Sequence, residues 1–289
     1  MADFIVGNDI SSYQGDPDFP TLVKNANFVI VKVTEGANYI NPNFQRDQSE
    51  ARRVGLALGY YHFARPSKGN SPETEAAFFL KTIGQLQEGE VLALDYEDNY
   101  SGDVVVWCRA FLDYILAQTG VHPLIYLNKT LVKQYDWSAL VEEGYGLWLA
   151  AYDNNLITGD WKLVAMQQWT DAQVVPGLPG NVDGDYFFGT VEQFKLYGYH
   201  KPLVPGFSPS ASESPSSSVS PSLSPSNSVS SSDSPSASLS ASPSPSQEVP
   251  IDFAEMFYKL KNIIYMQWSW FGTNSWINRL HQLKKILES

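Results

Sequence analysis

Short apolar runs alternate with longer amphipathic stretches through the first part of the chain. Many of these runs are rich in Val, Ile, Tyr and Phe, which strands prefer. Eight have the length of a strand: Phe4–Asp9, Phe28–Thr34, Leu56–Phe63, Val91–Glu97, Pro123–Leu127, Gly146–Tyr152, Leu163–Trp169 and Val182–Phe187. The stretches between the earlier runs are typical of helices. Strands that alternate with helices predict a parallel α/β sheet or barrel. Eight strands in about 200 residues favour a small barrel, whose late connections are too short for full helices.

Local signals mark the ends of two predicted helices. Ser71 and Pro72 give an N-cap followed by a proline at the first helical position. In the second helix, Ser101 is the predicted cap and Gly120 the predicted stop. This helix carries Cys108, the only cysteine of the chain. A single cysteine excludes an intramolecular disulfide and a Cys-rich zinc site, so a packed and inert thiol is expected.

The composition changes sharply near Phe207, and three segments are predicted. Residues 1–206 hold the barrel. Residues 207–249 are mostly Ser with Pro and Ala, which bury too little apolar surface to fold, so a disordered linker is expected. It is either a tether that sets the reach between two modules or a spacer without specific chemistry. Residues 250–289 carry two amphipathic stripes around a turn, which predicts a helical hairpin.

The predicted hairpin differs from the rest of the chain in charge. It has five Lys or Arg and three Asp or Glu, a net charge of +2, so the remaining residues carry −14 of the total of −12. Its basic, Trp-rich character leaves three kinds of contact open: an envelope or membrane surface, self-association, or docking on the main domain.

Charge and composition also bound the partners and the location. An acidic chain argues against nucleic acid as a partner, because such proteins usually present a basic face. The segment Met1–Gly7 lacks a basic n-region and a long apolar h-region, so synthesis without a signal peptide is expected. No run reaches the roughly 18 uninterrupted apolar residues of a membrane span.

The most informative residues follow the apolar run Val91–Leu94. Asp95 and Glu97 stand two positions apart on a predicted strand, so their side chains share one face and that of Tyr96 takes the other. Two carboxyl groups placed together repel as charges, which raises one pKa and lets one group hold a proton near neutral pH. A protonated carboxyl group beside an ionised one is the arrangement that glycoside hydrolases use to cleave a glycosidic bond.

An ordered set of short motifs extends this interpretation. In chain order the motifs are Gly7–Gly15 (GNDISSYQG), Val29–Gly36 (VIVKVTEG), Gly59–Ala64 (GYYHFA), Leu94–Glu97 (LDYE), Leu147–Tyr152 (LWLAAY), Gln167–Thr170 (QQWT) and Val182–Asp183. Each one is weak alone, but together and in this order they are specific. Residues 3 to about 195 thereby resemble the glycoside hydrolase family 25 lysozymes, the Chalaropsis-type N-acetylmuramidases.

This resemblance implies a fold and a set of site residues. The fold is an irregular eight-stranded β/α barrel of the TIM type, with its active site at the carboxyl ends of the strands. Asp9, Asp95, Glu97 and Asp183 would converge there. By resemblance Glu97 is the general acid. Asp95 would either orient the N-acetyl group of the substrate for attack, or attack directly or stabilise the oxocarbenium-like state. Asp9 and Asp183 would hold the pair and tune its field.

Neighbouring polar residues have plainer interpretations. A carboxylate at a strand end is often a helix cap or a solvated loop residue, and this interpretation is preferred for Asp98. Asp185 could share the face of Asp183, but only Asp183 matches the motif. His62 is expected to be packed or hydrogen-bonded and not to act as a base.

Aromatic residues at predicted strand ends are candidates for an open groove that binds the glycan, because sugar C–H faces stack on aromatic rings. The candidates are Tyr61, Tyr126, Trp148 and Tyr152, with Gln168 as a polar contact; core packing is the alternative for each. The four histidines are scattered, and no Gly-rich phosphate loop precedes a helix. Hydrolysis by paired carboxylates needs neither a metal nor an organic cofactor.

The expected function is hydrolysis of bacterial peptidoglycan at the β-1,4 bond between N-acetylmuramic acid and N-acetylglucosamine. Synthesis without a signal peptide fits a phage or prophage endolysin, a lysin carried on a virion, or export by a non-classical path. Two alternatives remain: a non-catalytic protein of the cell wall or virion on the same barrel, and a chitinase-like hydrolase. All four carboxylates are present, which argues against the first. The longer Asp-x-x-Asp-x-Asp-x-Glu run is absent, which argues against the second.

Overall fold

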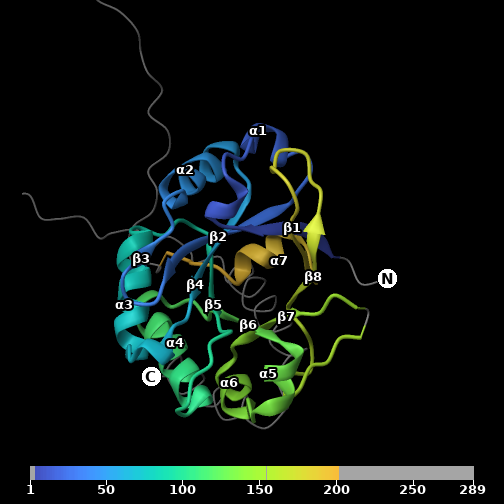
Figure 1. The fold of residues 1–289 in the computed structure, drawn as a ribbon. Coiled ribbons are helices and arrows are strands. Elements are labelled where there is room, and N and C mark those ends of the chain that lie inside the picture. Colours follow the sequence, from blue (N-terminus) through green and yellow to red (C-terminus); the bar gives the residue numbers. More distant parts are fainter. Residues whose placement is uncertain (1–3, 154, 202–289) are drawn as a thin grey trace, which may run out of the picture. The chain divides into compact units, whose positions relative to one another are not determined.

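The computed structural model describes residues 4–153 and 155–201, and Figure 1 draws their helices and strands. The predicted linker at 207–249 and the predicted hairpin at 250–289 lie outside the described residues. The boundary proposed at residue 206 lies outside them as well.

Eight strands close into a barrel. They are β1 Ile5–Ile10, β2 Phe28–Glu35, β4 Ala57–Phe63, β5 Val91–Asp95, β6 Leu124–Asn128, β7 Gly146–Ala150, β8 Met166–Gln173 and β9 Val182–Phe187. Pairing runs from β1 through β2, β4, β5, β6, β7 and β8 to β9, which returns to β1. Every pairing is parallel except those of β9, which is antiparallel to both β8 and β1. The two-residue strand β3, Tyr39–Ile40, forms a hairpin with the end of β2. The predicted irregular eight-stranded barrel is confirmed.

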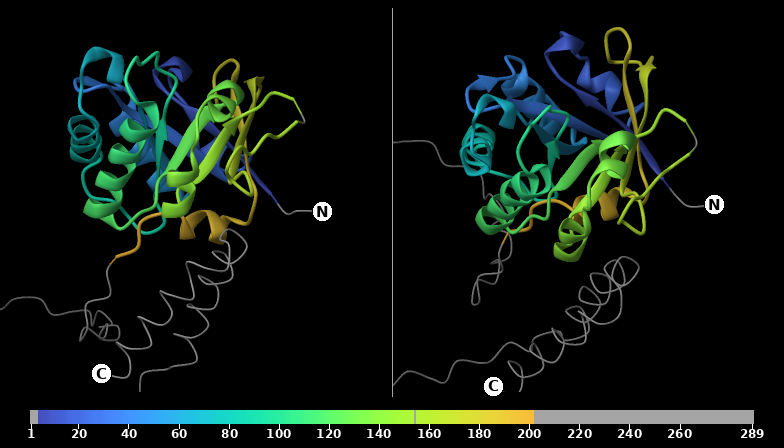
Figure 2. Two further views of the ribbon diagram at one scale, coloured as in Figure 1. Left: turned by 90° about the horizontal axis from the view of Figure 1, so that it is seen from below. Right: turned by 60° about the horizontal axis from the view of Figure 1, so that its bottom comes forward.

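Helices and short 3-10 turns connect the strands and cover the outside of the barrel (Figure 2). The helices are α1 Phe19–Leu22, α2 Phe44–Val54, α3 Pro72–Ile83, α4 Val104–Thr119, α5 Lys129–Gln134, α6 Ser138–Glu143 and α7 Val191–Leu196; the 3-10 turns are η1 Ser12–Gln14 and η2 Pro66–Lys68. In the described residues, no helix separates β7 from β8 or β8 from β9, as the short late connections predicted.

Of the two predicted N-caps, one is confirmed and the other is wrong. Ser71 caps α3, and its hydroxyl accepts a hydrogen bond from the backbone N–H of Thr74. The prediction of Ser101 as the cap of α4 is wrong: Asp103 takes that place and accepts from the N–H of Val106 at 3.0 Å. The helix begins one residue later, at Val104, and only the residue directly before it can reach the free amides of the first turn. Gly120 ends α4 as predicted.

Side chains along each strand point alternately to the outside and the inside of the barrel, and this produces two hydrophobic cores. Outward-facing residues such as Val29, Val31 and Leu92 pack under the helices, together with Cys108, which is buried as expected. Inward-facing residues fill the barrel, among them Phe28, Ile30, Ala93, Leu124 and Phe187. Helix α7 closes the end of the barrel at which the parallel strands start (Figure 2). There Phe194 stacks on Phe28 with ring centroids 4.9 Å apart. The opposite end, the barrel mouth, is where the inward-facing residues become polar.

Candidate active site

Carboxyl groups from three parts of the chain gather at the barrel mouth. Asp9 and Asp95 lie near or at the carboxyl ends of β1 and β5, and Glu97 follows β5 by two residues. Asp183 is the second residue of β9, and Asp185 follows it by two. Because β9 runs against its neighbours, its start lies at the same end of the barrel as the ends of the parallel strands. The reversed strand therefore brings Asp183 to the other predicted carboxylates.

Asp95 and Glu97 form a hydrogen-bonded pair at the end of β5. The predicted strand Val91–Glu97 is too long: β5 ends at Asp95, although the N–H of Tyr96 still bonds to the carbonyl of Tyr126 on β6 at 3.2 Å. Tyr96 packs in the outer core while Asp95 and Glu97 interact with each other, as the predicted alternation of faces requires. Asp95 is only 7% exposed, whereas Glu97 is exposed to solvent.

Burial controls the protonation of this pair. It raises the pKa of Asp95 well above its ordinary value, and the charges of Glu97 and Asp9 add to the rise. The pKa of Glu97 is raised as well, because its carboxyl group is partly shielded from water although the residue is exposed; its hydrogen bond from Asp95 and the positive charges of Arg65 and Lys32 oppose the rise. Both shifts favour a proton held on this pair, and Glu97 is the member that faces solvent.

A second carboxyl cluster consists of Asp9, Asp183 and Asp185. Burial and the charge of Asp183 raise the pKa of Asp9 to about 8. Burial and the nearby Asp171 raise the pKa of Asp183 to about 6. Asp185 is fully buried, and burial with the charge of Asp9 raises its pKa well above the ordinary value. The structure brings Asp185 into the site beside Asp183; the signal was its position two residues further along the same strand.

The polar and aromatic candidates surround these clusters. Gln168 is fixed by three bonds: its amide nitrogen donates to Asp9 at 2.8 Å, and its oxygen accepts from the hydroxyls of Tyr126 and Tyr152, each at 2.9 Å. The indole of Trp148 donates to Asp185 at 2.9 Å and is 1% exposed, so it positions a carboxyl group and offers no free ring face.

The three predicted tyrosines differ in exposure. The ring of Tyr126 packs edge-on against Trp148 at 4.9 Å, and that of Tyr61 does so at 6.4 Å. Both rings are buried and face the carboxyl groups from the barrel interior, since the charges of Asp9 and Asp95 raise the pKa of each hydroxyl beyond the effect of burial. Tyr152 is 55% exposed and is the candidate with the most open ring.

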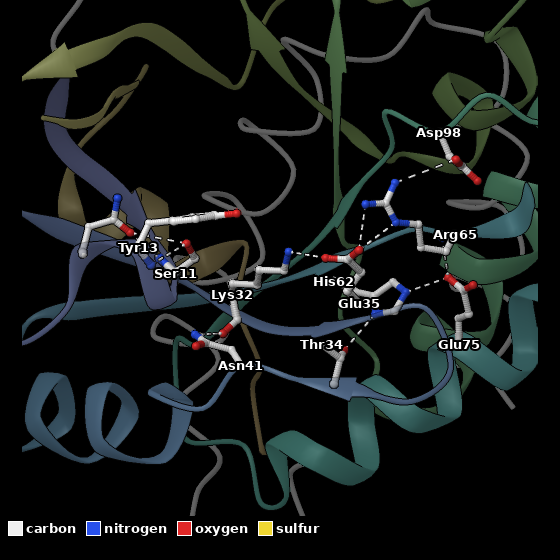
Figure 3. Close-up of polar contacts among 11 residues, drawn as sticks. Ser11, Tyr13, Lys32, Thr34, Glu35, Asn41, His62, Arg65, Glu75 and Asp98 are labelled. Atoms are coloured by element: carbon white, nitrogen blue, oxygen red, sulfur yellow. Dashed lines mark hydrogen bonds and ion pairs between the residues drawn. The ribbon is translucent and has the colours of Figure 1, made fainter. Parts of the chain in front are cut away.

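Three charged residues at the mouth had no role assigned from sequence. Figure 3 shows Lys32 and Arg65 on either side of Glu35, with ion pairs of 2.7 Å to each. Both cations also lie over the ring of Phe63, at 4.6 and 4.3 Å. These cations outweigh burial and hold the pKa of Glu35 below its ordinary value. A signal was available: Lys32 interrupts an apolar strand two positions after Ile30, on the face that points into the barrel.

Asp98 and His62 support this region. Asp98 accepts a hydrogen bond from the N–H of Ser67 at 2.7 Å, so it holds the η2 turn and is not a solvated loop residue. His62 is fully buried and lies 2.8 Å from both Thr34 and Glu75 (Figure 3). Burial lowers the pKa of His62. Its packed, hydrogen-bonded role is as predicted.

Among residues 4–153 and 155–201, no group of three or more His, Cys, Asp or Glu side chains is arranged to hold a metal ion. No helix within these ranges is long and apolar enough to cross a membrane. What the mouth does offer is a carboxyl pair that can donate a proton beside further carboxylates that can balance positive charge.

Comparison with known proteins agrees with this arrangement. An autolytic lysozyme of Clostridium acetobutylicum is 30% identical over 189 residues, which are 63% of this chain and 55% of the relative. The N,O-diacetylmuramidase of a Chalaropsis species is 33% identical over 43% of this chain and 66% of its own length. The lysozyme of Streptococcus phage Cp-7 is 30% identical over 51% of this chain and 43% of its own. This chain therefore spans about half to two thirds of these relatives.

A solved structure shows the same fold. The family GH25 lysozyme of Aspergillus fumigatus superposes with a TM-score of 0.58 at 28% identity and covers 68% of this chain and all of its own. The model of the family described as glycosyl hydrolases family 25 matches residues 8–178, which are more than half of the sequence. The resemblance inferred from the short motifs is confirmed. The expected class of enzyme, a glycoside hydrolase of the lysozyme type, is confirmed as well. The chain belongs to glycosyl hydrolase family 25.

Proposed function

We propose that this protein is a β-1,4-N-acetylmuramidase, which hydrolyses the bond from N-acetylmuramic acid to N-acetylglucosamine in bacterial peptidoglycan. The observation that carries the proposal is the hydrogen-bonded pair of Asp95 and Glu97 at the barrel mouth, with Asp95 buried and Glu97 exposed. Family membership and the similarity to lysozymes and a muramidase support the choice of substrate.

Glu97 acts as the general acid. It protonates the oxygen that leaves N-acetylmuramic acid, and the proton comes from the pair that it forms with Asp95. Positive charge then develops at the anomeric carbon, and the carboxylates of the mouth stabilise it. Water completes the reaction at that carbon, and Glu97 in its ionised form accepts the proton of the water.

The role of Asp95 follows from its distance to Glu97. In a direct double displacement, the acid and the nucleophile flank the bond, with carboxyl groups about 5–5.5 Å apart. Asp95 and Glu97 instead interact through a hydrogen bond, and two groups so close together are better placed to serve one side of the sugar than two opposite faces. This favours a substrate-assisted route, in which Asp95 orients the N-acetyl group and that group attacks the anomeric carbon. Direct attack by Asp95 is the alternative mechanism.

The remaining candidates hold the machinery in place. Asp9 and Asp183, with Asp185, set the field around the pair, and Gln168 fixes the geometry of Asp9. The buried rings of Tyr61, Tyr126 and Trp148 pack beneath the carboxyl groups and support them, and Tyr152 offers an exposed ring to the sugar.

Digestion of isolated cell walls tests this function. Purified protein should release fragments with new reducing ends at muramic acid, and Glu97→Gln should release none above background. New reducing ends at glucosamine, or cleavage of chitin but not of walls, would show that the protein is a different glycosidase and not a muramidase. Wall binding without any new reducing end would favour a non-catalytic wall protein.

The biological setting is a second part of the proposal. Similarity to a phage lysozyme supports a phage or prophage endolysin that reaches the wall through a membrane lesion. Contact of residues 250–289 with the envelope, or with a second copy, belongs to the same proposal. Expression inside bacteria with and without a co-expressed holin tests it: lysis that requires the holin is the expected result, and lysis without it contradicts the release route.

A further inference from the structure

Three exposed apolar side chains lie at the barrel mouth on the side of β1 and β2. Tyr13 is 93% exposed, the largest value among the large hydrophobic residues of the described chain, and Tyr39 and Ile40 are 40% and 48% exposed. Tyr13 lies in η1, four residues after Asp9, and Tyr39 and Ile40 form β3, directly after β2. Since β1 and β2 are parallel neighbours, these two extensions leave the same edge of the barrel. We call this set the apolar shelf.

The turn that presents Tyr13 is firmly built. The backbone N–H of Ser11 donates to the buried side chain of Gln14 at 2.7 Å, which closes a capping box around the turn. Gly15 ends the turn with φ of 62°, a conformation that other residues rarely adopt. Its carbonyl accepts from Asn43 at 3.1 Å and from Arg46 at 2.6 Å. An exposed ring on so many anchors loses little backbone freedom when it binds a ligand.

Hydrogen bonds connect the two parts of the shelf, and Lys32 relates the shelf to Asp95 and Glu97. Asn43 follows β3 closely and bonds to the Tyr13 turn, while Asn41 donates to the carbonyl of Lys32 at 2.8 Å. The ammonium of Lys32 lies 5.7 Å from the centre of the Tyr39 ring and acts electrostatically on both Asp95 and Glu97. Figure 3 shows the Tyr13 ring extending from its turn in the direction of Lys32.

Single exposed hydrophobic residues are common on proteins and need no explanation. The shelf differs because the turn of Tyr13 is firmly held, is hydrogen-bonded to Asn43 shortly after β3, and follows the strand that carries Asp9. Sugar rings present apolar C–H faces that pack on aromatic rings, and a glycan strand extends well beyond the bond that is cut. We propose that the apolar shelf, led by Tyr13, binds a sugar of the glycan strand outside the residues that flank the scissile bond. This proposal rests on the proposed muramidase function.

Chain-length dependence tests the shelf. Tyr13→Ala should raise KM for long glycan strands about three- to ten-fold, with a smaller effect on kcat, and the loss should shrink on a tetrasaccharide too short to reach the shelf. Tyr13→Trp should restore the KM. Phe4→Ala is the matched control, because Phe4 is an aromatic residue 51% exposed at the opposite end of β1, and it should behave as the unaltered protein.

Binding without turnover separates the two proposals. In a Glu97→Gln background, the affinity for isolated glycan strands should fall about three- to ten-fold when Tyr13→Ala is added and should recover with Tyr13→Trp. An unchanged affinity and an unchanged KM in the Tyr13→Ala variants would overturn the shelf while leaving the muramidase in place. Failure of the unaltered protein to cut walls, with glycan binding still dependent on Tyr13, would overturn the muramidase alone.

Discussion

Carboxyl groups at the barrel mouth differ in chemistry because they differ in exposure and in neighbours. Asp95 is buried and Glu97 is exposed, although they are two residues apart and share a hydrogen bond. The buried member keeps the shared proton from bulk water, and the exposed member can present it to a substrate. At the scale of single residues, function depends on this contrast more than on the number of acids.

Glu97→Gln tests that contrast. The amide is nearly isosteric and can still hydrogen-bond to Asp95, so the fold should persist. It has no acidic proton to give, so kcat on cell walls should fall by about 10²–10⁴. Glu73→Gln removes an exposed carboxylate from the first turn of α3 and serves as the control with unaltered kcat. Turnover near that of the unaltered protein in Glu97→Gln would remove Glu97 from the reaction.

The raised pKa of Asp9 makes the free energy of unfolding depend on pH. Its pKa is about 8 in the fold and 3.8 in the unfolded reference, so the folded protein holds a proton that the unfolded chain releases above about pH 4. Stability should therefore fall as the pH rises from about 4 to about 8, and the penalty should be complete above that range. Asp9→Asn cannot ionise and should be about 1–3 kcal/mol more stable than the unaltered protein at pH 9, with little difference at pH 4.

Urea unfolding across this pH range measures the effect. Asp18→Asn is the control, because Asp18 is an exposed N-cap whose hydrogen bonds from Thr21 lower its pKa, and Asn caps helices equally well. The control should follow the unaltered protein from pH 4 upward. If the curve of Asp9→Asn also runs parallel to that of the unaltered protein, Asp9 does not carry a proton in the folded state.

At the scale of elements, packing at the closed end of the barrel fixes the position of β1, the strand that carries Asp9 to the open end. Gly7 on β1 faces the ring of Phe28 on β2, and a Cβ at Gly7 would lie 2.6 Å from that ring. The position is two residues before Asp9 on the same face of β1, so a shift of this strand would move a carboxyl group of the site.

Gly7→Ala should therefore overpack the barrel interior and lower the free energy of unfolding by about 1–3 kcal/mol. Phe28→Leu makes room for the added methyl group, so the double variant should lose less than the sum of the two single losses. Denaturant unfolding of the three variants measures this coupling. Strictly additive losses would mean that the close approach of Gly7 and Phe28 does not limit the packing.

Sequence predicted the strands well and their ends poorly. All eight apolar runs hold a strand, because a buried strand needs consecutive apolar residues whatever surrounds it. Strand β5 ends at Asp95, two residues before the predicted end, and the cap of α4 at Asp103 depends on where the helix starts. Such tertiary and local geometric details leave little trace in periodicity.

The candidate site followed from motifs, but its supporting ion pairs did not. Asp9 and Asp183 were predicted by resemblance, and barrel closure with a reversed last strand explains why they meet. The ion pair of Glu35 and Arg65 joins the end of β2 to the loop after β4, and no local pattern relates these two positions, although Lys32 stands out within its apolar strand. Their arrangement becomes visible only when neighbouring strands are placed side by side.

At the scale of the whole molecule, the described residues contain a complete barrel. Its eight strands, both cores and every candidate site residue lie between residues 4 and 201. A domain with its own core is expected to fold alone, so a chain that ends at residue 206 should cleave soluble glycan fragments within about two-fold of the full chain. Loss of this activity in a folded truncation would make residues 207–289 part of the catalytic unit.

Insoluble walls then isolate the contribution of residues 207–289. A second wall-binding segment joined by a linker raises the effective concentration of the barrel at the wall and contributes nothing on small soluble fragments. If residues 250–289 bind the envelope, the truncated chain should lose about ten-fold or more in wall cleavage while keeping its soluble activity. Glu97→Gln in the full chain should keep wall binding, which controls for turnover. Equal wall cleavage by the full and truncated chains would exclude an envelope role for this segment and favour self-association or docking on the barrel.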